Sequence, residues 1–168
     1  TVQIEPLDYR FFILRRDIML DVKDILSGDY VGKKVTVCGW VRNHRKQKEF
    51  GFIDFSDGTC FKHLQIVYDN KLKEFEEILK IKNGSSIEVT GEIVSSVGSG
   101  QTIELRATNV KLLGDCPDEY PMQPKQHTKE FLREQAYLRP RTNLFQAVFR
   151  VRSIAAHALE SYVLANGF

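Results

Sequence analysis

Apolar and polar residues alternate along five stretches of this chain, and a period of two is typical of half-buried β-strands. The clearest is the fourth, in which Ile87, Val89 and Ile93 alternate with charged or hydroxyl side chains. In the fifth, the apolar phase shifts between Ala107 and Val110, which indicates a β-bulge. The predicted strands are residues 34–42, 50–56, 61–68, 86–94 and 102–112.

A period near 3.6 residues predicts two short helices among these strands. Residues 20–26 form an amphipathic helix that ends near Gly28, and residues 71–80 form another between the third and fourth strands. The apolar stripe of the second helix is Leu72, Phe75, Ile78 and Leu79. Three strands, a helix and two strands in roughly ninety residues is the order of an OB-fold, a five-stranded, partly open Greek-key barrel. An SH3-like barrel is the main alternative, and the helix after the third strand argues against it.

The composition changes after the fifth strand, where glycine and prolines become frequent. This change predicts a linker or hinge over 114–137, with a short helical piece near 128–135. We therefore assign 19–113 to the OB-fold domain. Residues 1–18 precede the methionine before the first helix, and we interpret them as a leader or an added segment.

A long helix is predicted over 144–165. Thr142 or Asn143 can cap its start, and Gly167 lies where a helix would end. One face of this helix is apolar and is formed by Leu144, Val148, Val151, Ala155, Ala158, Leu159 and Tyr162. A continuous apolar face of this kind is a packing surface.

The second strand predicts an aromatic side chain on the outside of the barrel. Phe52 shares a strand face with Asp54, and an unpaired carboxylate is too costly to bury. The outer face of the next strand carries His63, Gln65 and Val67. Exposed aromatic rings stack on bases and amides read base edges, so this surface is typical of a single-stranded nucleic-acid platform. The alternative is that Phe52 packs under a loop or against another domain.

Positive charge gathers beside this surface, although the net charge of the chain is only +2. A run of seven residues in the first hairpin contains four cationic side chains and one histidine: Arg42, His44, Arg45, Lys46 and Lys48. Such a run in isolation is a solvated hairpin loop. Next to an exposed Phe52, phosphate contact is the better interpretation.

Several kinds of chemistry are not indicated. The three cysteines are far apart and lack metal-ligand spacing, so we expect reduced thiols in the cytoplasm and neither a disulfide framework nor a metal site. We expect no membrane span and no signal peptide. The sequence offers no glycine-rich phosphate loop and no nucleophile–base pair, so we predict no catalytic residue and no cofactor in this chain.

From residue 20 to residue 168 the chain resembles the N-terminal part of the bacterial asparagine–tRNA ligases, class II aminoacyl-tRNA synthetases of the aspartate/asparagine/lysine subgroup. The resemblance rests on GWV at 39–41 with Arg45, GFIDFSDGTCFKHLQIV at 51–67, YPMQP at 120–124 and LRPRTNLFQAVFRVRS at 138–153. The aspartate enzymes have a shorter link between the stacking Phe and the reading Gln, and an RYLDLR-type run where this chain has LRPRTN. Asparagine is therefore favoured over aspartate, and lysine is less favoured still.

The resemblance implies that the barrel binds the anticodon stem-loop of a tRNA. By position, Phe52 would stack on the central uridine and Gln65 would bond its edge. Arg45 would contact the stem-loop through a phosphate or a base. Glu104 would contact a neighbouring anticodon base, and a solvated surface charge is the alternative for this residue.

For the full-length enzyme, the resemblance implies attachment of asparagine to tRNA with ATP and Mg²⁺, and a homodimer formed through residues 144–165. Residues 138–168 would be the incomplete start of the catalytic domain, without the motifs of the ATP and amino-acid site. We therefore expect these residues to be inactive alone. The alternatives are a free-standing OB-fold RNA-binding protein, the corresponding segment of an aspartate–tRNA ligase, or an assembly module that dimerises through the long helix.

Overall fold

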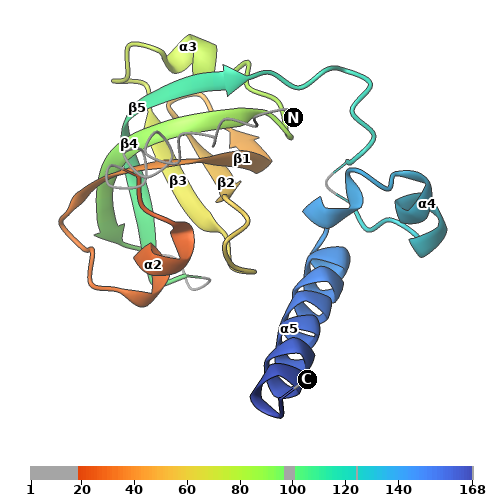
Figure 1. Ribbon diagram of the computed structural model, residues 1–168. Coiled ribbons are helices and arrows are strands. Elements are labelled where there is room, and N and C mark those ends of the chain that lie inside the picture. The colour runs from red at the N-terminus through yellow and green to blue at the C-terminus, as the bar shows by residue number, and fades with distance from the viewer. Residues whose placement is uncertain (1–18, 97–100, 124, 168) are drawn as a thin grey trace, which may run out of the picture. The chain divides into compact units, whose positions relative to one another are not determined.

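Five strands close into a barrel in the computed structural model, which describes residues 19–96, 101–123 and 125–167 (Figure 1). The chain divides into two units, Thr1–Pro124 and Lys125–Phe168, and the barrel lies in the first. The expected leader at 1–18 and the glycine/serine turn at 97–100 lie outside the described residues.

The barrel has the strand order β1-β2-β3-β5-β4. All neighbouring strands are antiparallel except β3 and β5, which run parallel. The strands are β1 (Lys34–Lys46), β2 (Phe50–Ser56), β3 (Leu64–Asp69), β4 (Ser86–Ser95) and β5 (Ile103–Gly114). This is the predicted OB-fold, and the order of its elements is confirmed.

The predicted alternation of buried and exposed residues is confirmed in the central strands. In β2, Ile53 and Phe55 are fully buried, whereas Phe52 on the opposite face is partly exposed. In β3, Tyr68 is 1% exposed while Gln65 faces outward. Side chains at alternate positions therefore fill the barrel, and the positions between them form its outer face.

The register of the ladders shifts at three places, one of them at Ser86/Ile87 where the pairing of β4 with β5 begins. The pairing of β4 with β5 shifts so that Thr90 lies opposite Asn109 and Gly91 opposite Ala107, which confirms the bulge predicted in the fifth strand. A second shift, in β1, leaves Arg42 as an extra residue between two paired positions. The alternation of apolar and polar residues does not indicate this bulge in β1, which reverses the facing of every later residue of the strand.

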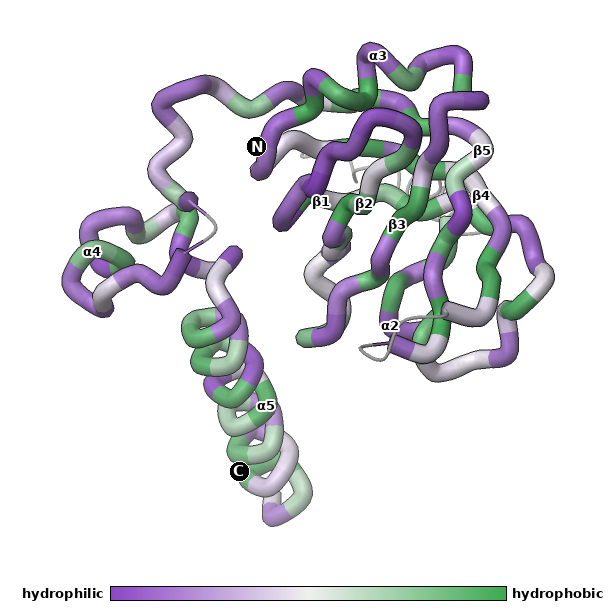
Figure 2. The backbone as a smooth tube through the Cα atoms, turned by 180° about the vertical axis from the view of Figure 1, so that it is seen from behind, coloured by the Kyte–Doolittle hydropathy of each residue, from purple (hydrophilic) through white to green (hydrophobic). Residues whose placement is uncertain are grey.

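The helices α2 (Val22–Ser27) and α3 (Phe75–Ile78) lie at opposite ends of the barrel (Figures 1 and 2). The predicted helix at 71–80 is too long, since only Phe75–Ile78 is helical. The residues before it form turns, in which the Asp69 carboxylate accepts a hydrogen bond from the Lys71 amide. The prediction that the apolar stripe of this helix faces the core is correct, because Phe75 and Ile78 are buried.

Several strand boundaries also differ from the prediction, most of all in the first and third strands. The first strand continues to Lys46 instead of ending at 42, and the third begins at Leu64 instead of 61. Phe61 is 48% exposed and precedes the strand.

The second unit contains α4 (Lys129–Glu134), the short 3-10 helix η1 (Arg139–Arg141) and α5 (Asn143–Ala165). The Thr142 hydroxyl accepts a hydrogen bond from the Phe145 amide, so the predicted long helix and its cap are confirmed. Hydrophobic residues recur along α5 in Figure 2, and large apolar side chains such as Val151 and Tyr162 lie exposed. Within the described ranges, no helix is long and apolar enough to cross a membrane.

Candidate nucleic-acid interface

Strand pairing places Arg45 of β1 directly beside Phe52 of β2 on the outer face. The Arg45 Cζ atom lies 5.2 Å from the centre of the Phe52 ring, a cation–π distance. The edge of Phe50 meets the same ring, with centroids 5.4 Å apart and the planes at 90°. Phe52 is therefore held by two neighbours while its side chain remains partly exposed.

Gln65 of β3 connects Arg45, which lies beside Phe52, to Glu104 on β5. Arg45 Nη2 donates a hydrogen bond to Gln65 Oε1 at 3.2 Å, and Gln65 Nε2 donates one to Glu104 Oε2 at 3.3 Å. The Ser96 hydroxyl donates to the same Glu104 oxygen at 3.1 Å. We call Arg45, Phe52, Gln65 and Glu104 the outer-face cluster. Its members come from β1, β2, β3 and β5 and form one connected row.

The structure shows what surrounds Glu104. Its carboxylate is half-buried, and one of its oxygens, Oε2, accepts hydrogen bonds from both Gln65 and Ser96. Sequence reasoning did not find Ser96, because its contact depends on the β4–β5 pairing. The alternation of the second strand places Phe50 on the same face as Phe52, but sequence reasoning did not name Phe50 as a residue of the site.

The four predicted cations do not form one loop patch. Arg42, Arg45 and Lys46 belong to β1, and only Lys48 lies in the turn that follows. After the bulge at Arg42, Arg45 faces outward with Phe52, whereas Lys46 pairs with the inward-facing Gly51. Of these residues, which we expected in or beside the first loop, Lys48 lies in it and Lys46 is the last strand residue before it, because the strand is longer than expected.

His44 faces the inside of the barrel end. Its Nδ1 lies 3.0 Å from the Ile81 carbonyl oxygen and its Nε2 lies 2.6 Å from the Tyr68 hydroxyl. A carbonyl can only accept, so Nδ1 carries the proton and Nε2 accepts from Tyr68 in the neutral ring. Burial lowers the pKa of His44 and raises the pKa of Tyr68 to about 12.

Gly51 makes room for Tyr68, the buried member of this pair. A Cβ atom at position 51 would collide with the hydroxyl and ring of Tyr68. Glycine is therefore required here by close approach of a side chain, not by an unusual backbone angle.

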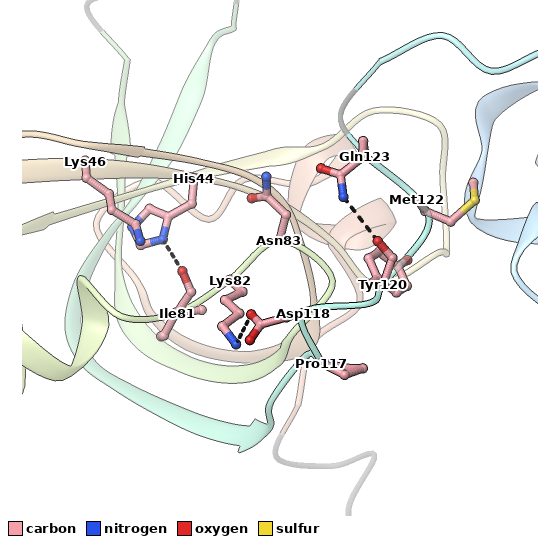
Figure 3. Close-up of a pocket in the computed structure, with 10 residues that line it drawn as sticks. All are labelled: His44, Lys46, Ile81, Lys82, Asn83, Pro117, Asp118, Tyr120, Met122 and Gln123. Atoms are coloured by element: carbon pink, nitrogen blue, oxygen red, sulfur yellow. Dashed lines mark hydrogen bonds and ion pairs between the residues drawn. The ribbon is translucent and has the colours of Figure 1, made fainter.

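A cavity of about 260 Å³ lies at the same end of the barrel (Figure 3). His44 and Lys46 of β1, the loop after α3 and the segment after β5 all contribute to its lining. An ion pair of 2.8 Å between Lys82 and Asp118 joins the last two. Across the described part of the chain, no group of three or more histidine, cysteine or carboxylate side chains could hold a metal ion.

The fold agrees with the comparison to known families. Residues 35–113 match the family model described as an OB-fold nucleic acid binding domain, so this segment belongs to that family of domains. Over 83% of its length the chain corresponds, at about 50% identity, to the N-terminal part of the bacterial asparagine–tRNA ligases. The resemblance noted in the sequence is confirmed.

Two relatives illustrate the extent of the match. The chain is 51% identical over 140 residues to the asparagine–tRNA ligase of Acholeplasma laidlawii, which covers 83% of this chain and 30% of that enzyme. It is 50% identical over 141 residues to the asparagine–tRNA ligase of Acetivibrio thermocellus, with the same coverage. The chain thus spans about 30% of the length of these relatives.

Solved structures support the fold. The asparaginyl-tRNA synthetase of Pyrococcus horikoshii, complexed with asparaginyl-adenylate, aligns with a TM-score of 0.77 at 22% identity and covers 89% of this chain and 35% of that one. The aspartyl-tRNA synthetase of Entamoeba histolytica also reaches 0.77, at 15% identity, and covers 98% of this chain and 41% of its own. At these identities the similarity concerns the fold alone.

Proposed function

We propose that the outer-face cluster binds the anticodon loop of a tRNA as part of an asparagine–tRNA ligase. The observation that carries the proposal is the row Arg45–Phe52–Gln65, in which a cation, an aromatic ring and an amide lie together on an exposed strand face of an OB-fold. Cationic and aromatic groups on such a face hold single-stranded nucleic acid by charge and by stacking. An amide beside them adds hydrogen bonding to a base edge.

Each member of the cluster has a role in this proposal. Phe52 stacks on the central uridine of the anticodon, and Gln65 bonds the edge of that base. Arg45 lies between ring and amide, so it can contact the same base or the phosphate next to it. Glu104 belongs to the interface through its bond to Gln65.

The remaining cations serve a different purpose. Arg42 and Lys48 lie before and after Arg45 along the chain, and Lys46 lies on the other side of the same strand. We assign to them phosphate contacts that carry no sequence information. Because of its facing, Lys46 reaches only RNA that passes around the end of β1.

The full-length enzyme would attach asparagine to its tRNA with ATP and Mg²⁺ in the cytoplasm, and would form a homodimer through the apolar face of α5. The chain spans about 30% of the length of its relatives, and we assign the ATP and amino-acid chemistry to the rest of the enzyme and no step of it to this chain.

Alanine substitution of the stacking residue tests the proposal. Phe52→Ala should weaken binding of an anticodon stem-loop with a central uridine by about 1–3 kcal/mol, because a base stack is lost. Gln65→Ala should weaken it as well. Binding is measured by fluorescence anisotropy of a labelled stem-loop, and circular dichroism checks that the barrel is intact.

Phe61→Ala is the matched control, since Phe61 is a second exposed aromatic residue outside the cluster. It should leave the affinity unchanged. Equal losses in Phe52→Ala and Phe61→Ala, or none in either, would refute the proposed site.

A further inference from the structure

The orientation of the Gln65 side-chain amide is fixed from both sides. Arg45 lies on one side and can only donate hydrogen bonds, so it requires the Oε1 end. Glu104 lies on the other side and its carboxylate accepts, so it requires the Nε2 end. A rotated amide would place Oε1 against a carboxylate oxygen and Nε2 against a guanidinium, and both hydrogen bonds would be lost.

The Glu104 carboxylate, which accepts a hydrogen bond from the Gln65 amide, has a second hydrogen-bond donor. Ser96 donates a hydrogen bond to Glu104 Oε2, the same oxygen that accepts from Gln65. The other acidic residue near Gln65 is Asp54, its cross-strand partner, and that carboxylate is paired with His63 at 2.9 Å. Of these two acids, Glu104 is the one that orients the Gln65 amide, together with Arg45 on the other side.

Gln65 keeps hydrogen-bonding capacity for a ligand. A primary amide has two N–H donors and two acceptor lone pairs. Arg45 and Glu104 use one of each, which leaves one donor and one acceptor in a known order across the barrel face: the acceptor toward Arg45 and the donor toward Glu104.

This order matters for the choice between the two pyrimidines. The Watson–Crick edge of uracil presents an N3–H donor beside the O4 acceptor, whereas cytosine presents the N3 acceptor beside an amino donor. For a ring stacked in one position, the two bases therefore require opposite orientations of the same amide. An amide that can rotate accepts both bases, and a fixed amide accepts one.

We propose that Glu104 is a positioning residue that fixes the Gln65 amide so that the barrel accepts uracil and rejects cytosine at the central anticodon position. This inference rests on the proposed function, because it requires a base stacked on Phe52. Glu104 need not touch the RNA for this role. Glu104 affects the choice between uracil and cytosine through Gln65, whereas stacking on Phe52 contributes affinity for either base.

The variant Glu104→Gln tests the inference. A glutamine at 104 can donate as well as accept, so it tolerates either orientation of the Gln65 amide. Two stem-loops that differ only in a central U or C are titrated against the full chain. We expect the wild-type chain to prefer U by roughly 5- to 150-fold, the range of one paired base edge. In Glu104→Gln the logarithm of the U-to-C affinity ratio should fall to half of its wild-type value or less, mainly because the C stem-loop binds more tightly.

Glu92→Gln is the matched control. It makes the same change of charge at an exposed position of β4, which pairs with Arg106 of β5. It should keep the wild-type ratio. A merely structural role for Glu104 would lower the affinity for both stem-loops alike and leave their ratio unchanged, and that result would overturn the inference.

The design separates the two proposals. If the wild-type chain binds neither stem-loop, or does not distinguish U from C, the proposed function fails. If the wild type discriminates and Glu104→Gln does so equally well, only the positioning role of Glu104 is overturned.

Discussion

Two consecutive residues of β1, His44 and Arg45, lie in opposite environments. Both ring nitrogens of His44 are bonded within the barrel end, to Ile81 and Tyr68. Arg45 is exposed, and its guanidinium has more N–H donors than its bond to Gln65 uses. The inner side of the strand end therefore stabilises the barrel, while the outer side retains capacity for a ligand.

The bulge at Arg42 creates this difference. Without the extra residue, the period of two set by Val37 and Val41 would place Arg45 on the inner side and His44 on the outer side. One additional residue exchanges them. The bulge thus places Arg45 beside Phe52 on the outer face and His44 beside Tyr68 on the inner face.

The largest effect we expect concerns the inner side. Gly51→Ala should lower the free energy of unfolding by about 1–3 kcal/mol, because the new methyl group overlaps the buried Tyr68 ring. Urea denaturation measures the loss. In a Tyr68→Leu background the same substitution should cost less, since the colliding atoms are gone. Equal costs in both backgrounds would show that Tyr68 is not the obstacle.

A pair of neighbouring cations compares the two sides directly. Arg45→Ala and Lys46→Ala each remove one positive charge, from opposite faces of β1. Arg45→Ala should reduce both affinity and discrimination of the central base, because it frees one end of the Gln65 amide. Lys46→Ala should weaken all stem-loops alike and flatten the slope of log affinity against log salt by roughly 0.7. Titrations at several salt concentrations give both quantities.

The phosphate role of the cations has its own failure condition. A variant with alanine at Arg42, Lys46 and Lys48 should lose a larger part of the salt slope than any single variant. If its slope equals that of the wild type, these residues are only solvated charges.

The smallest effect concerns pH. Burial lowers the pKa of His44 in the folded state, so the unfolded chain binds the proton more readily. The free energy of unfolding should therefore decrease as the pH falls below the ordinary histidine value of about 6.5, until the lowered folded pKa is reached. His44→Gln should reduce this dependence in urea titrations across pH. An unchanged dependence in His44→Gln would assign the effect to other groups.

The pattern of the sequence predicted the fold because its signals are local. Alternation in 50–56 and 86–94 identified the strand faces, and the phase shift after Ala107 identified one bulge. The helix at 71–80 was predicted too long, since an apolar stripe continues into turns that pack in the same direction. The bulge at Arg42 leaves no such signal, because polar residues follow it on both faces.

The candidate site was predicted in part for the same reason. Phe52 and Gln65 follow from the facing of single strands. The bonds of Gln65 to Arg45 and Glu104 join β3 to β1 and β5, and they depend on the closure of the barrel. Contacts between distant segments are not encoded in the periodicity of either segment, so the sequence alone could not show that Glu104 orients Gln65.

A double-mutant cycle between Phe52 and the central base tests most directly whether this base stacks on the outer face. The stem-loop is prepared with uridine and with an abasic nucleotide at the central position, and each is titrated against the wild-type chain and Phe52→Ala. If the two groups stack, Phe52→Ala should weaken the uridine stem-loop by about 1–3 kcal/mol and have almost no effect on the abasic one. Equal losses with both stem-loops would show that Phe52 does not contact the central base and would contradict the proposed site.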